Sequence, residues 1–362
     1  MRVVIAPDSF KGTIDAPAAA AELAAGWRSI RPGDELVESP MADGGEGTLD
    51  AIAAATPAAE RVAVRVTGPD DRPVDAAFLL LPDGTAVVEL AVTSGITLLD
   101  PLRPLTAHTR GFGAAVRAAL DAGATGLLLS IGGSASTDGG AGALRELGAR
   151  FLGADGREVE DGAAGLLRLE TVDPAGLRPA PGGGVRVLTD VVNPLLGPEG
   201  AAAVYGPQKG AEPEDVTVLE AALARLAELL PVDPATPGAG AAGGTGFGLL
   251  AWGAVLVPGA SAVADTTGLR AAITGSDLVI TGEGRFDGQS SQGKVADTVR
   301  SLAAGVPVAL VAGAIDADPA GYASAISLTD LVGREASFAD PAEALRRAGA
   351  ELASVRTEKG TR

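Results

Sequence analysis

The sequence contains no cysteine and a single histidine, His108. The absence of cysteine excludes disulfide bonds, thiolate nucleophiles and cysteine metal sites together. One histidine cannot build a metal site of several histidines, and it leaves very little room for a Ser-His catalytic pair. Because His108 precedes an expected helix start at Thr109, we expect it to cap that helix or to lie on the surface. Acid–base chemistry should then fall to carboxylates, lysine or tyrosine.

Positive charge is also scarce, because 28 Lys and Arg residues face 46 Asp and Glu residues, for a net charge of −18. Nucleic-acid binders normally carry a basic face, and anionic membranes attract basic segments, so we expect neither partner. The opening MRVVIAP is typical of a strand and not of a signal peptide. The most apolar stretch, residues 247–264, contains Pro258, which favours a buried helix and turn over a membrane span. We therefore expect a cytoplasmic protein, and nothing in the sequence makes an oligomer evident.

Aromatic residues make up only 3% of the chain, so the core must be built from Ala, Val, Leu and Ile. Residues 3–55 alternate short apolar runs with helical spacing, which is typical of a parallel sheet covered by helices. From Arg61 the pattern changes to a period of two, and residues 82–84 (Pro-Asp-Gly) predict a hairpin turn. The alternation of short apolar runs with helical spacing returns from about Asp265. The sequence thus predicts an α/β protein with a Rossmann-like parallel sheet from residues 1–60 and 265–362, and an inserted mixed-sheet α/β domain over 61–264.

Glycine-rich turns follow most of the expected strands and precede helices. They are PDSFKGT (7–13), MADGGEGT (41–48), IGGSASTDGGAG (131–142), TDVVNPL (189–195) with GPQKGA (206–211), and ITGEGRFDGQSSQGK (280–294). Ligands of parallel α/β sheets bind at the carboxyl ends of the strands, where such loops gather. Glycine lets backbone N–H groups approach a phosphate, and a following helix N-terminus favours its charge. A single loop of this kind could merely end a strand, but five with a carboxylate or lysine favour a phosphate site.

Two nucleotide-binding patterns occur, each in an unsuitable context. Gly238–Gly243 fits the dinucleotide fingerprint but follows PVDPATP, not a strand. Gly288–Lys294 fits most of a P-loop, but Val295 stands where a Ser or Thr would hold Mg²⁺. Lys294 at a helix start still suits a phosphate.

Lysine is rare, with only four among the 28 basic residues. Lys359 lies in the polar tail, whereas the other three each stand beside glycine in one of the loops: Lys11, Lys209 and Lys294. A chain that prefers arginine retains lysine where a compact point charge is needed, and phosphate contact is one such need. Chance placement remains the alternative.

Carboxylates gather in the same loops, namely Asp43, Glu46, Asp138, Asp190, Glu283 and Asp287. Phosphoryl transfer needs a group that accepts the proton of the attacking hydroxyl, and oxygen ligands for Mg²⁺. For Asp138 and Glu46, which precede helices, we expect helix capping or turn formation. For Asp190, which follows the buried strand VRVL, and for Glu283 we favour a functional role.

Six long motifs in order resemble the type-1 glycerate kinases: IAPDSFKGT, SPMADGGEGTLDAI, IGGSASTDGGAGAL, DVVNPLLGPEGAAAVYGPQKGA, GAGAAGGTGFGLLAWG and DLVITGEGRFDGQSSQGK. The resemblance runs from Arg2 to about Ala353. It implies ATP and Mg²⁺ as cofactors, D-glycerate as acceptor, 2-phosphoglycerate in preference to 3-phosphoglycerate as product, and an active site in a cleft between two α/β domains. It carries over these residues: Asp8, Ser9, Lys11, Asp43, Asp190, Asn193, Gln208, Lys209, Glu283 and Asp287.

The residue roles that we expect follow from both arguments. The catalytic residues are Asp190, as proton acceptor, with Lys11 and Lys294. The substrate-binding residues are Asp8, Ser9, Arg285 and Asn193. The nucleotide-binding residues are Gly132, Gly133, Ser134, Ser136, Thr137, Gln208, Lys209, Gly282 and Gly284. The metal ligands are Asp43, Glu283 and Asp287. Two alternatives remain, an NAD-dependent hydroxy-acid dehydrogenase that uses Gly238–Gly243, and a non-catalytic protein that binds phosphate esters.

Overall fold

The computed structural model describes residues 1–287 and 295–359, with side chains as far as residue 355. The chain forms two compact units. Unit 1 consists of Met1–Asp43, Asp50–Pro57 and Pro258–Arg362, and unit 2 of Gly44–Leu49 and Ala58–Val257. Helix α2 (Thr48–Ala55) carries residues of both.

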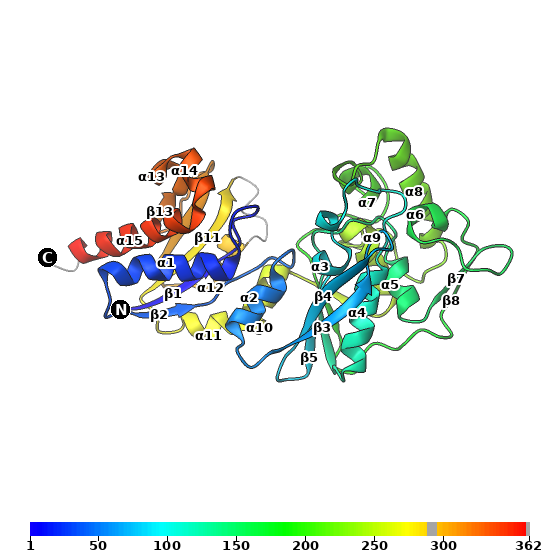
Figure 1. Ribbon diagram of the computed structural model, residues 1–362, viewed down its shortest axis with the longest axis horizontal. Coiled ribbons are helices and arrows are strands. Elements are labelled where there is room, and N and C mark those ends of the chain that lie inside the picture. The colour runs from blue at the N-terminus through cyan, green and yellow to red at the C-terminus, as the bar shows by residue number, and fades with distance from the viewer. Residues whose placement is uncertain (288–294, 360–362) are drawn as a thin grey trace. The chain divides into compact units, whose positions relative to one another are not determined.

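Unit 1 is built on a five-stranded parallel sheet with the order β13-β12-β11-β1-β2 (Figure 1). Its strands are β1 (Arg2–Pro7), β2 (Glu35–Glu38), β11 (Leu278–Phe286), β12 (Val308–Ile315) and β13 (Ser324–Ser327). Its helices are α1 (Ala16–Ile30), α10 (Gly259–Thr267), α11 (Leu269–Ile273), α12 (Val295–Leu302), α13 (Leu328–Val332), α14 (Arg334–Ala339) and α15 (Pro341–Lys359). Ile5 of β1 pairs with Glu38 on one side and with Ile280 on the other. Both ends of the chain therefore build one sheet.

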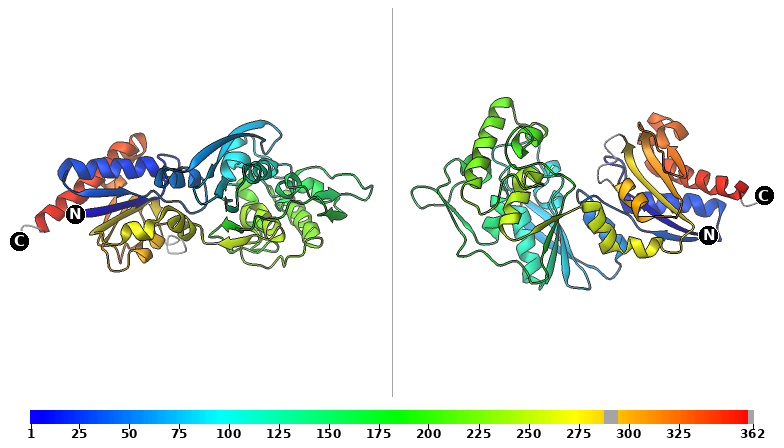
Figure 2. Two further views of the ribbon diagram at one scale, coloured as in Figure 1. Left: turned by 90° about the horizontal axis from the view of Figure 1, so that it is seen from below. Right: turned by 180° about the vertical axis from the view of Figure 1, so that it is seen from behind.

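Alternate residues of the unit 1 strands face two helical layers, as the period of two in a strand requires. Val3 and Ile5 point into a core shared with α1 and α15, which lie side by side (Figure 1). A Cβ at Gly26 would stand 1.9 Å from the carbonyl oxygen of Arg346, and one at Gly349 would stand 2.2 Å from that of Leu23. The two glycines thus allow the helices to touch through their backbones. The segment with α10 and α11 lies on the opposite face of the sheet (Figure 2, left).

Unit 2 contains a six-stranded mixed sheet with the order β10-β9-β6-β5-β4-β3. The strands are β3 (Glu60–Thr67), β4 (Pro73–Leu80), β5 (Thr85–Glu89), β6 (Gly126–Ser130), β9 (Val185–Leu188) and β10 (Val255–Val257), and a separate pair is β7 (Arg150–Leu152) and β8 (Thr171–Asp173). The helices are α3 (Ala91–Ser94), η1 (Ile96–Leu98), α4 (Arg110–Asp121), α5 (Ala141–Glu146), α6 (Gly162–Leu166), α7 (Ala201–Tyr205), η2 (Pro207–Lys209), α8 (Pro213–Ala227) and α9 (Ala241–Ala251). Strands β5, β6, β9 and β10 run parallel, whereas β3, β4 and β5 form antiparallel pairs.

The fold agrees with the main sequence prediction. An α/β chain with one parallel sheet from both chain ends and a second, mixed sheet is confirmed, and so is the hairpin at residues 82–84, which joins β4 to β5. The stretch 247–264 forms the end of α9, strand β10 and the start of α10, which is more structure than the predicted helix and turn. In the described ranges, no helix combines the length and apolar character needed to cross a bilayer. The predicted domain boundaries stay a prediction.

Candidate active site

A cavity of about 320 Å³ in unit 1 brings together most of the residues that the sequence places in its first and last loops. Its polar lining contains Asp8, Ser9, Lys11, Asp43, Glu283 and Arg285, and Gly284 and Asp287 also border it. Asp8 and Ser9 follow the carboxyl end of β1, and Glu283 lies on the adjacent strand β11. The N–H of Asp8 donates to the carbonyl oxygen of Gly282 at 2.8 Å, which continues the strand pairing into the cavity wall.

Asp8 lies among the acidic side chains of this cavity, and its pKa is raised to about 7. Burial of the carboxyl group is the largest cause, and repulsion by Asp43 adds to it. The N–H of Ser9, which donates to Oδ1 of Asp8 at 2.6 Å, and the charge of Lys11 act in the opposite direction. Lys11 therefore does not fully offset the combined effect of burial and of the neighbouring carboxylates on Asp8.

The two basic residues of the cavity have largely exposed side chains, and each pairs with a carboxylate. Nζ of Lys11 lies 3.9 Å from Oδ2 of Asp43, and the lysine side chain is 72% exposed. Nε of Arg285 lies 2.6 Å from Oδ2 of Asp316, in an exposed ion pair. Exposed ion pairs of this kind contribute little to stability, so both cations are available for an anionic ligand.

The sequence prediction of a loop from residue 280 needs a correction, because residues 280–286 belong to a strand. Strand β11 continues to Phe286, which pairs in parallel with Ile315 of β12. A Cβ at Gly282 would stand 2.1 Å from the carbonyl oxygen of Val311, and one at Gly313 would stand 2.3 Å from that of Gly284. These glycines therefore permit the close approach of strands β11 and β12. This packing accounts for them without any contact to a phosphate. Their contact with a nucleotide stays a prediction.

In unit 2, Lys209 lies at the centre of a second polar cluster. Its side chain is 2% exposed, and Nζ donates to Oγ of Ser134 at 2.8 Å and to the carbonyl oxygen of Ser136 at 2.5 Å. Burial lowers the pKa of Lys209 to about 7, although Asp138 acts to raise it. The Oγ of Ser136 and the Oγ1 of Thr137 are buried and have no hydrogen-bond partner in the described part of the chain. The cluster thus holds an amine and two hydroxyls that could serve a ligand.

Three consecutive residues of α9 have left-handed backbone conformations, and one of them packs directly against this cluster. Ala242, Gly243 and Gly244 have φ values of 55°, 67° and 84°. A Cβ at Gly243 would stand 2.1 Å from the carbonyl oxygen of Ser136 and 2.8 Å from Nζ of Lys209. Gly243, the last glycine of the dinucleotide fingerprint, is therefore explained by backbone conformation and close packing. Gly238 has a φ of +84°, and a Cβ at Gly240 would stand 2.2 Å from the carbonyl oxygen of Pro194, so the same explanation covers the other two. No strand leads into them, since residues 231–240 contain none.

The remaining predicted residues of unit 2 have separate surroundings. Asp190 is half-buried just beyond the carboxyl end of β9. The Asn193 amide donates to the carbonyl oxygen of Glu199 at 2.8 Å and accepts from the Tyr205 hydroxyl at 2.7 Å. Those two bonds hold the turn before α7, so a substrate contact by Asn193 would have to compete with them.

Three further predicted residues of unit 2 lie in turns. Gln208 is exposed on η2. The N–H of Gly132 donates to the carbonyl oxygen of Gly44 at 3.1 Å, and the carbonyl oxygen of Gly133 accepts from Ile96 at 2.8 Å. Lys294 lies outside the described residues.

Asp138 caps helices, as its position in the sequence predicts. Its buried carboxylate accepts from the N–H and the Oγ1 of Thr109, both at 2.8 Å, and from the N–H groups of Gly140 and Gly142, both at 3.2 Å. Glu46 does not cap α2, because the N–H groups of Gly47 and Leu49 donate to another carboxylate, that of Glu89. Glu46 is exposed in the turn before α2, in agreement with the expected turn formation. Glu89 is 1% exposed at the end of β5, and no sequence pattern pointed to it.

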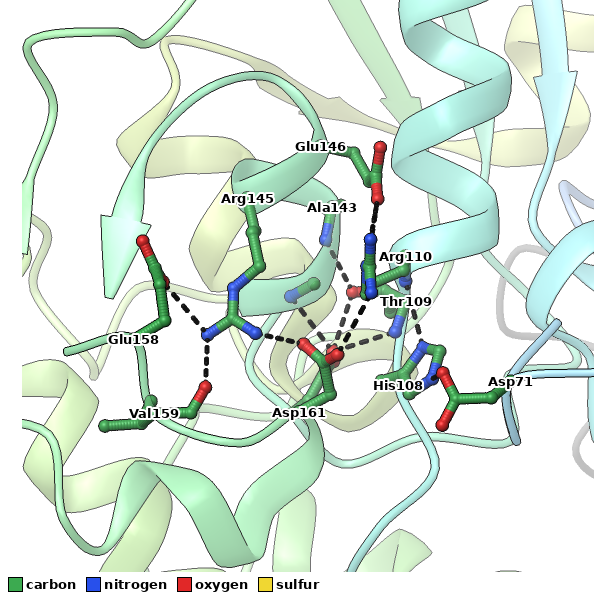
Figure 3. Close-up of polar contacts among 12 residues, drawn as sticks. Asp71, His108, Thr109, Arg110, Ala143, Arg145, Glu146, Glu158, Val159 and Asp161 are labelled. Atoms are coloured by element: carbon green, nitrogen blue, oxygen red, sulfur yellow. Dashed lines mark hydrogen bonds and ion pairs between the residues drawn. The ribbon is translucent and has the colours of Figure 1, made fainter. Parts of the chain in front are cut away.

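His108 takes part in a charge network that resembles a metal site in composition. Its ligand atoms and those of Asp71 and Asp161 lie within 4.8 Å of one another. Figure 3 shows that Asp161 is already held by two guanidinium groups, those of Arg110 and Arg145. Nδ1 of His108 accepts from the N–H of Arg110 at 3.4 Å, and Nε2 lies 3.4 Å from Oδ1 of Asp71. The group therefore does not suit a cation. His108 is 2% exposed, which makes the expected surface position wrong and leaves the helix-start position correct.

The chain is similar over nearly its whole length to proteins of one family. The family model described as "Glycerate kinase family" matches residues 3–358. The chain is 42% identical over 332 residues to the glycerate kinase of Bacillus subtilis (strain 168). That alignment covers 88% of this chain and 86% of the Bacillus protein. The chain is 43% identical over 330 residues to the glycerate 2-kinase of Escherichia coli (strain K12), with the same coverage. A solved structure from Salmonella typhimurium LT2, described as a candidate glycerate kinase 2, has a TM-score of 0.88, 39% identity and full coverage of both chains.

This chain belongs to the glycerate kinase family. The resemblance stated from six motifs is confirmed, and so is the prediction of an enzyme of the phosphotransferase class. The dehydrogenase interpretation of Gly238–Gly243 finds no support in the family or in the geometry of α9. Beyond the predicted residues, the structure adds apolar residues to the unit 1 cavity: Phe10 of the first glycine-rich motif, and Leu328, Phe338 and Pro341, which lie in none of the motifs.

Proposed function

We propose that this protein transfers the γ-phosphoryl group of ATP to a hydroxyl of D-glycerate, and that the product is 2-phosphoglycerate rather than 3-phosphoglycerate. The observation that carries the proposal is the unit 1 cavity, where Asp8, Asp43 and Glu283 stand beside Lys11 and Arg285. Carboxylates and cations in one cavity suit a metal-bound polyphosphate and an organic acid together. The similarity to the glycerate 2-kinase of Escherichia coli supports the 2-position.

Magnesium fits the acidic side of this cavity. Mg²⁺ prefers oxygen ligands and commonly takes one or two carboxylates together with substrate phosphates. The pKa of Asp8 is raised by burial and then by Asp43 and Glu283, which is the behaviour expected of carboxylates that a cation would relieve. We propose Asp43, Glu283 and Asp287 as its ligands. The chemistry that Mg²⁺ supplies there is to offset the negative charge of the phosphate oxygens.

The proposed reaction is an in-line displacement with the following balance. A hydroxyl oxygen of glycerate forms a bond to the γ-phosphorus, the bond from that phosphorus to the β–γ bridging oxygen breaks, and ADP leaves. We propose that Asp190 accepts the hydroxyl proton and that Lys11 and Lys294 offset charge on the transferred group. Arg285 would bind the glycerate carboxylate through two parallel hydrogen bonds.

The other proposed contacts follow the sequence motifs. Asp8, Ser9 and Asn193 would complete the acid site. The nucleotide would be bound by Gly132, Gly133, Ser134, Ser136, Thr137, Gln208, Lys209, Gly282 and Gly284. Because ATP is an intracellular donor, we further propose that the protein acts in the cytoplasm.

A coupled assay of ADP release tests the proposal directly. We expect ADP release from ATP and Mg²⁺ to depend on D-glycerate, and phosphorus NMR to identify 2-phosphoglycerate as the product. Lactate, which retains only the 2-hydroxyl, should accept phosphate, whereas 3-hydroxypropionate should not. ADP release that is no faster with D-glycerate than without it contradicts the proposed substrate, and a 3-phosphoglycerate signal contradicts the proposed position.

The metal ligands can be tested without turnover. Mn²⁺ in place of Mg²⁺ reports its own binding through its electron paramagnetic resonance signal. We expect Glu283→Gln to weaken Mn²⁺ binding, whereas Glu335→Gln, an exposed carboxylate of α14 that does not line the cavity, should leave it unchanged. Equal Mn²⁺ affinity in the wild type and Glu283→Gln would remove Glu283 from the ligand set.

A further inference from the structure

The unit 1 cavity has an apolar side that the proposed acid substrate does not explain. The cavity lining includes four apolar side chains, Phe10, Leu328, Phe338 and Pro341, besides the charged residues. Glycerate is a three-carbon acid with an oxygen on every carbon, so an apolar wall contributes nothing to its binding. A cavity of about 320 Å³ also falls within the range of sites for considerably larger ligands, about 300–1,000 Å³. A second ligand group, apolar and larger, is therefore expected there.

Phe338 is unusual among the phenylalanines of this chain. Five of the seven are buried, namely Phe10, Phe78, Phe112, Phe151 and Phe247, whereas Phe338 is 60% exposed. A large apolar side chain on a cavity rim, in a protein with so few aromatic residues, is the kind of exposed group that a ligand commonly covers. Its position favours a ligand with a flat apolar face.

The ring of Phe338 is supported from one side and anchored at its base. The guanidinium carbon of Arg334 lies 5.7 Å from the ring centroid. The preceding residue, Ser337, is buried and donates from Oγ to the carbonyl oxygen of Arg334 at 2.8 Å. After α14, Oδ1 of Asp340 accepts from the N–H of Glu343 at 3.0 Å and caps α15. The backbone on both sides of Phe338 is thus fixed by hydrogen bonds, so the ring is preorganised for stacking.

We propose that Phe338 is the platform on which the adenine ring of the nucleotide stacks, and so determines specificity for the phosphoryl donor. The inference rests on the proposed function, because it takes ATP as that donor. Aromatic side chains bind nucleobases by stacking on any base, through contact of two flat faces. The same cavity contains Lys11, which we propose offsets charge on the transferred phosphoryl group, and Gly284, which the sequence assigns to nucleotide binding, also borders it.

Affinity for ADP, measured apart from turnover, tests this platform. Loss of one base–aromatic stack weakens binding by roughly tenfold or more, on the scale where 1.4 kcal/mol is a factor of ten. We expect Phe338→Ala to raise the Kd of ADP by about that factor, and Phe338→Tyr to leave it near the wild-type value. The control is Leu331→Ala, which removes an exposed apolar side chain of α13 outside the cavity lining and should leave the Kd unchanged.

A ligand without a base separates stacking from phosphate binding. Inorganic tripolyphosphate carries the charge of a nucleotide but nothing that stacks, so its affinity should be the same in wild type and Phe338→Ala. A direct signal comes from Phe338→Trp, because both native tryptophans, Trp27 and Trp252, are buried. We expect ADP to quench the new fluorescence and tripolyphosphate to leave it unchanged.

Three outcomes would overturn the inference: an unchanged Kd of ADP in Phe338→Ala, an equal loss of tripolyphosphate affinity, or a Phe338→Trp signal that does not respond to ADP. A rise in the KM of glycerate alone would also overturn it, because the cavity would then take the acid and not the base. Failure of the proposed function is separate, since it would be seen as a wild-type protein that releases no ADP in response to glycerate.

Discussion

Nζ of Lys209 lies 2.8 Å from Oγ of Ser134 and donates a hydrogen bond to it, inside a cluster where the lysine is 2% exposed. A second bond runs to the carbonyl oxygen of Ser136, and burial lowers the pKa of the amine to about 7. A neutral amine has two protons, and these two bonds use both. The structure therefore accommodates the neutral form without an unmet hydrogen-bond requirement.

The first prediction concerns the pH dependence of stability. Between about pH 7 and the ordinary lysine pKa of 10.5, the unfolded chain binds a proton at Lys209 that the folded protein does not. The free energy of unfolding should therefore rise with pH across this range, and the stabilisation should be lost as the pH falls towards 7. Lys209→Met removes the group, so urea unfolding at the two ends of the range should show a smaller rise than the wild type. The same pH slope in both proteins would contradict the lowered pKa.

The second prediction concerns the left-handed run beside Lys209. Gly243→Ala places a Cβ 2.1 Å from the carbonyl oxygen of Ser136 at a φ of +67°. Gly253→Ala is the matched control, because its φ is +98° and a Cβ there meets nothing within 4 Å. The control should lose only the cost of a left-handed alanine, about 1–2 kcal/mol. Gly243→Ala should lose about 1–3 kcal/mol more from overpacking, measured by urea unfolding. Equal losses of the free energy of unfolding in the two variants would show that the residues around Gly243 move to accommodate the methyl group at little cost.

Much of the fold could be predicted because local patterns and tertiary packing agree. The period of two and the turn at residues 82–84 predict β4 and β5. The length of β11 could not be predicted from residues 282–286, since glycine in a strand normally indicates a bulge or an end. Here Gly282 is required because Val311 of the next strand comes too close for a side chain, and only the partner strand reveals that.

The site was predictable where one loop carries both the glycines and the charged groups. Asp8, Lys11, Asp43 and Glu283 line one cavity, as their loop positions suggested. Phe338 was not predictable, because its exposure and its place on the rim depend on how α14 packs. Lys209 shows a different limit: its sequence context suggests an accessible phosphate contact, but burial and the bond to Ser134 arise from a segment 75 residues away.

The third prediction separates two carboxylates near the start of α2. Glu89 is buried and its oxygens accept from the N–H groups of Gly47 at 3.1 Å and Leu49 at 2.9 Å, whereas Glu46 is exposed. Glu89→Gln replaces one acceptor by a donor and should lower the free energy of unfolding by about 1.5–3 kcal/mol. Glu46→Gln should change it by less than about 0.5 kcal/mol, as surface substitutions usually do. Urea unfolding of both variants checks the difference, and a larger loss for Glu46→Gln would reverse the assignment of the helix cap.

The last prediction tests which acid accepts the hydroxyl proton. If Asp190 does so, Asp190→Asn should lower kcat by about 10²–10⁴-fold with little change in the KM of ATP, because proton transfer contributes to the transition state and not to binding. Asp8→Asn should chiefly raise the KM of glycerate or the requirement for Mg²⁺, since Asp8 is a proposed glycerate contact and lines the same cavity as the proposed Mg²⁺ ligands Asp43 and Glu283. Asp233→Asn, which removes a charge from a turn in unit 2, serves as the control and should keep the wild-type values. Steady-state kinetics with equal melting temperatures distinguishes the cases. A large loss of kcat in Asp8→Asn together with near-normal turnover in Asp190→Asn would move the role of proton acceptor from Asp190 to Asp8.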